Sequence, residues 1–193
     1  LQCYKNFKLT NKQSSNLLDK IRFQLVKSDN QNIKKCIKIL HITNFNEKHN
    51  GRLFFNTGRR LNNGFIRLGH SVLEFSDRDI VSYYRNINDF KGSRKLNTKL
   101  IEVISNYVPD LIVLGHADLI EIKTLRLIKK TYPQIRIAQW FLDRMDTNWK
   151  NNRERFLDKI NLVDASFCTS DPKTLNLSNK KKVFYIPNPV DSS

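Results

Sequence analysis

The sequence predicts an α/β fold, in which a doubly wound, mostly parallel sheet carries helices on both of its faces. From residue 36 onward, short runs rich in β-branched residues alternate with segments in which apolar residues recur at helical spacing. The run Leu111–Leu114 is apolar throughout, which is typical of a parallel strand buried on both faces. Strands and helices that alternate at this spacing are joined by right-handed crossovers, which place helices on both sides of the sheet.

The predicted strands are the segments in which Val, Ile, Leu and Phe are concentrated. They lie at 36–42, 70–75, 110–114, 135–140, 165–168 and 182–186, and a further short strand is predicted near 80–84. The last strand cannot extend beyond Ile186, because Pro187 and Pro189 lack the N–H group that a sheet requires.

The predicted helices lie at 56–68, 98–107, 118–132 and 152–162. Apolar residues share one face of the first helix, and Gly69 is its expected stop. Pro109 and Pro133 follow the second and third helices, as expected for helix ends. Asp118 is interpreted as the N-cap of the third helix.

Residues 1–35 differ in composition from the rest and are predicted to be a basic N-terminal extension or linker. They carry eight Lys and Arg residues against Asp19 and Asp29 only, and their apolar residues predict one amphipathic helix around 14–27. Either an arm that binds lipid or nucleic acid or a simple linker fits this pattern. Residues 36–193 are predicted to form one Rossmann-like domain. Because the chain starts at Leu1 and stops just after a strand, we expect a piece of a longer protein.

The charge balance favours anionic partners. The chain has 34 Lys and Arg residues against 18 Asp and Glu, a net charge of +16. A compositional bias toward Lys, Asn and Ile explains the same excess without any partner. The apolar runs are too short to span a membrane. Cys3, Cys36 and Cys168 form no close pair and the four histidines have no metal-ligand spacing, so we expect a cytoplasmic protein without disulfides or a metal cofactor.

Ligands of such folds bind in the loops that follow the strands, at the carboxyl edge of the sheet. The longest of these loops follows the first strand and contains Asn50, Gly51, Arg52 and Asn56. Glycine allows a backbone to approach a ligand closely, and the start of the next helix can hold an anion. We therefore predict that these four residues bind substrate, although an ordinary connecting loop has the same composition.

Three further loops carry candidate residues. Asp77 follows the second strand and is predicted to accept hydrogen bonds from sugar hydroxyls, or alternatively to pair with Arg78. His116 is a candidate proton carrier, or a structural histidine. Asp143 is the candidate general base, and Trp140 before it can stack on a sugar or be buried in the core.

The order of several short motifs resembles the glycosyltransferases built from two Rossmann-like domains, the GT-B architecture. The segment 69–72 (Gly-His-Ser-Val) resembles the family's "xxGHxV" turn, and 109–116 its "PDxIxxH" segment. Residues 165–170 resemble "aDxxxxxS", and 186–191 resemble "IPNGVD", with Pro189 in place of the usual glycine. Trp140–Asp143 is similar to the spore-maturation-like branch of group 1. The resemblance covers roughly residues 36–191.

The resemblance implies the N-terminal, acceptor-side half of an enzyme that transfers a sugar from a nucleotide sugar to an unidentified acceptor. Gly51 would lie near the donor phosphates, and His116 and Asp143 would line the cleft between two domains. A donor-binding domain would follow Asp191. Peripheral contact of basic residues with an anionic membrane is a further expectation, and specific binding of nucleic acid is not expected. The alternative is a non-catalytic Rossmann-like module that binds a nucleotide or a polyanion.

Overall fold

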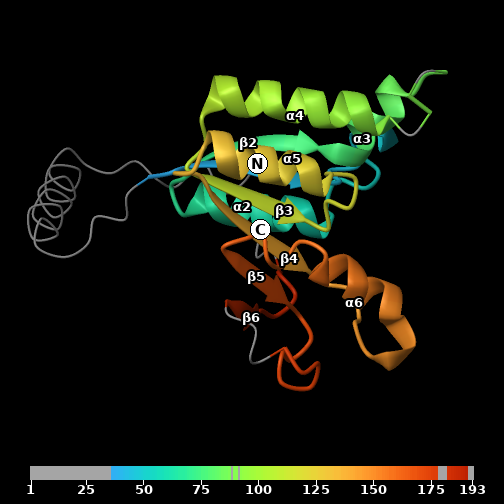
Figure 1. Cartoon of the computed structure of the whole chain (residues 1–193), viewed down its shortest axis with the longest axis vertical. Helices are drawn as coiled ribbons and strands as arrows, with labels where there is room; N and C mark the ends of the chain where they lie inside the picture. The colour runs from blue at the N-terminus through green and yellow to red at the C-terminus, as the bar shows by residue number, and fades with distance from the viewer. Residues whose placement is uncertain (1–35, 88, 91, 178–181, 191–193) are drawn as a thin grey trace, which may run out of the picture. The chain divides into compact units, whose positions relative to one another are not determined.

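A parallel sheet organises the chain in a computed structural model that describes residues 36–190 except 88, 91 and 178–181. Within these residues, six strands lie in the order β2-β1-β3-β4-β5-β6, and each neighbouring pair is parallel (Figure 1). The strands are β1 Lys38–Thr43, β2 Ser71–Ser76, β3 Leu111–Gly115, β4 Arg136–Phe141, β5 Ala165–Cys168 and β6 Val183–Tyr185. The predicted α/β class is therefore confirmed. The proposed extension at 1–35 and its helix at 14–27 lie outside the described residues.

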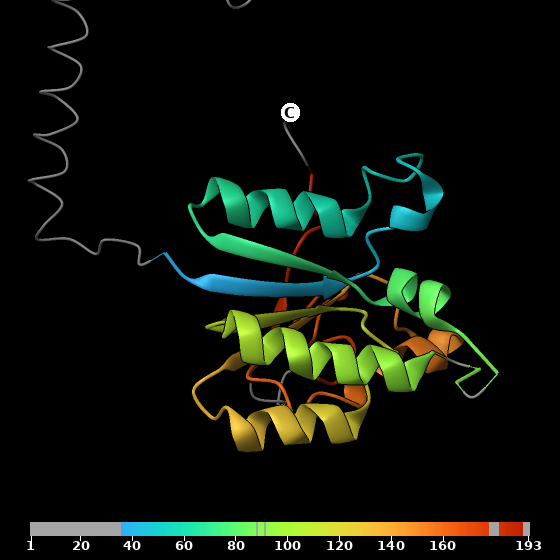
Figure 2. The ribbon, with the colours of Figure 1, turned by 90° about the horizontal axis from the view of Figure 1, so that it is seen from above.

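Helices cover both faces of the sheet, as predicted. Figure 2 shows α2 (Thr57–Arg67) on one face, and α4 (Ser93–Tyr107) and α5 (Ile122–Thr131) on the other. Two shorter helices, α3 (Asp77–Tyr84) and α6 (Lys150–Leu157), and the 3-10 turns η1 (Glu47–His49) and η2 (Thr147–Trp149) complete the elements.

The face under α4 and α5 holds the main apolar core. Leu40 and Ile42 of β1 are fully buried there against Leu100 and Ile104 of α4 and Leu125 of α5. Burial of each such side chain contributes roughly 1.5–3 kcal/mol relative to an exposed one. β3 packs into apolar clusters on both of its faces, which explains why Leu111–Leu114 is apolar throughout.

The face under α2 is different, because alternate residues of β1 point to it. Ile39, His41 and Thr43 are all buried, and only the first of them is aliphatic. Ile39 packs in a small cluster with Val113 and Trp140, and Leu61 of α2 packs against that cluster. The carboxyl end of β1 therefore presents a polar residue to this side of the sheet.

One predicted strand is wrong. Residues 80–84 belong to α3, a helix that starts directly after β2. Asp77 and Asp79 occupy its first turn, where carboxylates are favourable, and Val81 is buried in the main core. The acidic first turn and the burial of Val81 outweigh the strand preference of Ile80, Val81 and the two tyrosines. As a consequence, β2 is the edge of the described sheet.

Three predicted helix boundaries also differ from the structure. α4 starts at Ser93, five residues before the predicted position, because Leu96 is fully buried in the main core. α5 starts at Ile122 with Glu121 at its N-cap, so the interpretation of Asp118 as the cap is wrong. α6 covers Lys150–Leu157 instead of 152–162, and turns follow it.

Candidate functional site

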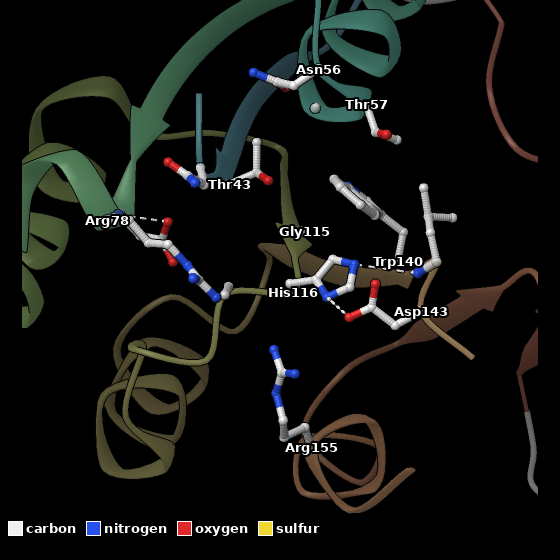
Figure 3. Close-up of a pocket in the computed structure, with 14 residues that line it drawn as sticks. Thr43, Asn56, Thr57, Arg78, Gly115, His116, Trp140, Asp143 and Arg155 are labelled. Atoms are coloured by element: carbon white, nitrogen blue, oxygen red, sulfur yellow. Dashed lines mark hydrogen bonds and ion pairs between the residues drawn. The ribbon is translucent and has the colours of Figure 1, made fainter. Parts of the chain in front are cut away.

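A pocket of about 350 Å³ opens at the carboxyl edge of the sheet, where the strand order changes direction between β1 and β3. Thr43 ends β1, Gly115 ends β3 and Trp140 lies near the end of β4, and all three line the pocket (Figure 3). The first residues of α2 and α3 close its other side. Open α/β sheets bind ligands at this kind of position, because the two crossovers leave a crevice there.

Five of the predicted site residues come together in this pocket. His116, Asp143, Asp77, Trp140 and Asn56 all line it, although they lie on four separate loops or strands. Their grouping could be predicted from the sequence only because the carboxyl ends of parallel strands meet at one edge of a sheet.

The other three predicted residues do not line this pocket. Asn50, Gly51 and Arg52 are exposed in the turns after η1. The backbone N–H groups of Glu47 and Lys48 donate to the buried carboxylate of Asp79, which fixes η1 beside α3. Gly51 therefore does not share the pocket that His116 and Asp143 line, and its predicted contact with substrate stays a prediction.

Gly51 has a conformational role at that place. Its φ angle is +86°, and no atom lies within 4 Å of where a Cβ would stand. A left-handed backbone favours glycine in a tight turn, whether or not a ligand is nearby. The sequence pattern of a long polar loop with a glycine could not separate this role from close approach to a ligand.

Two glycines that the sequence analysis missed do shape the pocket. A Cβ on Gly115 would stand 2.2 Å from the indole of Trp140, and one on Gly58 would stand 2.6 Å from Cγ2 of Thr43. Both residues line the pocket. Their absent side chains allow α2 and Trp140 to lie close to the strand ends. In the sequence, Gly115 directly follows a predicted strand and Gly58 lies at the start of a predicted helix, and these positions were the only signals of their roles.

His116 and Asp143 lie next to one another in the lining of the pocket (Figure 3). His116 Nδ1 lies 3.5 Å from Oδ2 of Asp143, and its Nε2 accepts a hydrogen bond from the backbone N–H of Leu142 at 3.4 Å. Because Nε2 accepts, the proton of the neutral ring is on Nδ1 and points at the carboxylate. Burial lowers the pKa of His116, and the charge of Asp143 opposes that shift. The pair is therefore a neutral imidazole that orients a half-exposed carboxylate.

Asp77 supplies a second carboxyl group on the opposite wall. It is almost completely buried at the start of α3, and Oδ1 accepts the backbone N–H of Arg78 at 2.7 Å. Burial raises its pKa from 3.8 to about 6, while the hydrogen bond from Arg78 opposes that shift. Asp77 can therefore change protonation state close to neutral pH.

Two arginines add positive charge to the same pocket. Arg155 of α6 and Arg78 of α3 both bind the carboxylate of Asp118, Arg155 through two nitrogens. The hydrogen bond to Asp118 also raises the pKa of Arg155. Asp118, Asp77 and Asp143 offset the charge of the two guanidinium groups, so what the arginines offer a phosphate is N–H donors in a fixed geometry rather than an excess of positive charge.

The part of the chain that the structure describes contains no group of three metal-ligating residues, and no helix in it could cross a membrane. The chain matches no protein-family model, and no curated protein is significantly similar to it. The geometry of the pocket therefore carries the functional argument.

Proposed function

We propose that this pocket is the acceptor-side half of a glycosyltransferase active site, where a sugar passes from a nucleotide sugar to a hydroxyl group. The observation that carries the proposal is the pair of His116 and Asp143 in a pocket at the change of strand order, opposite Asp77. A ligand-binding crevice with an oriented carboxylate and a second carboxyl group fits a polyhydroxylated substrate. The motif resemblance of residues 36–191 points to the same reaction.

Asp143 is the residue best placed to accept a proton. His116 has both ring nitrogens engaged, by Leu142 and by Asp143 itself, so its part is to orient the carboxylate. In an inverting transfer, the acceptor O–H gives its proton to Asp143 while the acceptor oxygen bonds to the anomeric carbon. The bond from that carbon to the phosphate oxygen breaks, and the nucleoside diphosphate leaves with the electron pair.

The departing phosphate develops negative charge, and the pocket offers positive groups to it. The first N–H groups of α2, at Thr57 and Gly58, have no carbonyl within the helix to bond, because the helix starts at Thr57. Arg155 and Arg78 stand on the facing wall. Such preorganised donors stabilise the transition state more than the ground state. Further nucleotide contacts would come from a donor-binding domain, which the resemblance to the GT-B architecture implies.

Ligand binding to the chain tests the proposal. Saturation-transfer NMR with uridine, guanosine and adenosine diphosphate sugars, and with simple glycosides as acceptors, should show contacts for at least one compound. Asp143→Asn should weaken binding of the glycoside acceptor, because an amide is a weaker hydrogen-bond acceptor than a carboxylate. Glu102→Gln, an exposed carboxylate on α4, is the matched control and should behave as the unaltered chain. Absence of binding by every compound would overturn the proposal.

A second candidate is a non-catalytic module that binds a nucleotide or polyanion, which the net charge of +16 favours. This positive charge extends away from the pocket to exposed basic residues on α5, such as Lys123, Arg126 and Lys130. The same residues equally suit contact with an anionic membrane from the cytoplasmic side. Affinity for a polyanion should fall steeply with salt. Binding of an uncharged glycoside should change little, so a salt titration separates the two functions.

A further inference from the structure

A chain of polar groups runs from the pocket, between the sheet and α2, to Glu74 on β2. His41, at the centre of β1, is fully buried among the rings of Phe45, Phe65 and Trp140. Its Nε2 lies 3.2 Å from Nε1 of Trp140, and its Nδ1 lies 3.2 Å from Oδ1 of Asn62. No pattern in the sequence singles out His41.

Each hydrogen bond in this chain has one possible direction. The indole N–H can only donate, so Nε2 of His41 accepts and the ring proton is on Nδ1, where it donates to Oδ1 of Asn62. The amide nitrogen of Asn62 then donates to Glu74 at 2.8 Å, and Arg59 pairs with the same carboxylate oxygen. From the indole to Glu74, the donor of each bond meets an acceptor, whereas Nε of Arg59 is buried without a hydrogen-bond partner among the described residues.

The position of Trp140 depends on this chain. Trp140 lies on β4, which is separated from β1 by β3, so its indole must cross β3 to reach His41. It crosses at Gly115, its register partner, where a Cβ would stand 2.2 Å from the ring. The indole also packs against His116, with ring centroids 5.3 Å apart. The ring is only 6% exposed, so it forms the floor of the pocket rather than an open stacking surface.

We propose that His41 is a positioning residue for the pocket: it holds the indole of Trp140 across Gly115, and the indole in turn supports His116 and its contact with Asp143. The effect on substrate binding rests on the proposed function, whereas the effect on the indole does not.

Simple packing does not account for a histidine at this place. Burying a polar ring is unfavourable unless both nitrogens are bonded, and an apolar side chain of similar volume avoids that requirement. The neighbouring residues Leu40 and Ile42, which point to the other face of the same strand, show that β1 accommodates aliphatic residues readily. Both ring nitrogens of His41 are bonded, and such directional bonds specify one arrangement of the imidazole and the indole, which is the property a pocket floor requires.

The indole can be observed directly, because the chain has only two tryptophans, Trp140 and Trp149. In a Trp149→Phe background, the indole N–H of Trp140 gives the one indole N–H resonance in the NMR spectrum. The tryptophan fluorescence then comes from Trp140 alone, and acrylamide quenches it only by reaching the pocket floor. In His41→Phe the indole loses its acceptor. We expect its N–H to exchange roughly tenfold faster and acrylamide quenching to increase.

Two further variants separate positioning from packing. His41→Gln offers an amide oxygen for the indole and an N–H for Asn62, so it should restore slow exchange. Phe65→Leu removes an aromatic contact of the same imidazole but leaves both nitrogens bonded, so indole exchange should stay within about twofold of the unaltered chain. If His41→Phe does not fold, Trp140→Phe removes the same bond from the other side, and the His116 resonances should then shift.

The outcomes distinguish this inference from the proposed function. Unchanged indole exchange and quenching in His41→Phe, or failure of His41→Gln to restore them, would overturn the positioning role. Binding of uridine diphosphate glucose is the second measurement, and it should weaken in His41→Phe and recover in His41→Gln. If the unaltered chain binds neither this probe nor any other sugar nucleotide or glycoside, the proposed function fails, and the indole measurements alone decide the role of His41.

Discussion

The two faces of the sheet use the same strands for different purposes. Under α4 and α5, Leu40, Ile42, Leu100 and Leu125 form a continuous aliphatic core. Under α2, the intervening position of β1 carries His41, whose hydrogen bonds extend from Trp140 to Glu74. Aliphatic packing is non-directional and stabilises the domain, whereas directional hydrogen bonds select one geometry. The face of the sheet that buries fewer aliphatic residues is the one that shapes the pocket.

The largest expected effect comes from the aliphatic face. Leu100→Ala should lower the free energy of unfolding by about 2–5 kcal/mol, because it leaves a cavity in a fully packed region. Urea denaturation measures the loss. Leu61→Ala on α2 should cost less, since Leu61 is only half-buried. An equal or greater loss of unfolding free energy in Leu61→Ala would contradict the inference that the face under α4 and α5 contributes most of the stability.

A smaller effect should depend on pH through His41. Burial lowers its pKa from 6.5 to about 4, so between these values the unfolded chain binds more protons than the folded one. The stability that His41 contributes is thus present above pH 6.5 and is lost as the pH falls through 4, a change on the order of 3 kcal/mol. Urea denaturation should show the stability difference between the unaltered chain and His41→Gln changing in this pH range.

The pH dependence of stability that comes from Asp77 should have the opposite sign to that of His41. Burial raises its pKa from 3.8 to about 6, so the folded state binds more protons and the stability it contributes is lost as the pH rises through 6. Asp77→Asn should therefore raise the free energy of unfolding at pH 7.5 by about 1–3 kcal/mol and have little effect at pH 4. The same variant should weaken ligand binding. A stability gain that persists at pH 4 would contradict this assignment.

A change in unfolding free energy of similar size to that of Asp77→Asn is expected from a substitution at the pocket floor. Gly115→Ala forces the indole of Trp140 away from β3, because the new Cβ would overlap its ring. Overpacking of this kind costs about 1–3 kcal/mol. The fluorescence of Trp140 should change with it, in a Trp149→Phe background. Unchanged fluorescence would mean that the indole does not lie on Gly115.

The smallest effects separate two glycines on one helix. Gly58→Ala brings a Cβ against Thr43 at the pocket wall and should be destabilising. Gly64→Ala on the same helix meets no atom within 4 Å, so it should stabilise the chain by roughly 0.5–1 kcal/mol through the lower entropy of the unfolded state. Thermal denaturation of the two variants should shift in opposite directions, and a shift in the same direction would contradict the structure.

Much of the fold could be predicted because its signals are local. The apolar runs at 110–114 and 135–140 mark β3 and β4 to within a residue, and Gly69 marks the end of α2. The error at 80–84 arose where local preference and tertiary packing disagree. Ile80 and Val81 prefer strands, but the acidic first turn and the contact of Val81 with the main core make the segment helical.

The candidate site could be predicted only in part. His116, Asp143 and Asp77 follow strands, so the topology rule alone brought them together. The roles of Gly58, Gly115 and His41 could not be predicted, because each depends on a neighbour from another strand. No local pattern distinguishes Gly115, beneath an indole, from Gly51, which serves a turn.

The sequence by itself determined the alternation of strands and helices and the loops that meet at the carboxyl edge, because hydrophobic periodicity and turn residues act over a few positions. Only the tertiary structure decided which side chains touch. His41 and Trp140 are 99 residues apart, and their hydrogen bond exists because β1, β3 and β4 lie side by side and the residue between them is glycine. Contacts of that range depend on strand order and on the volume of every side chain in between.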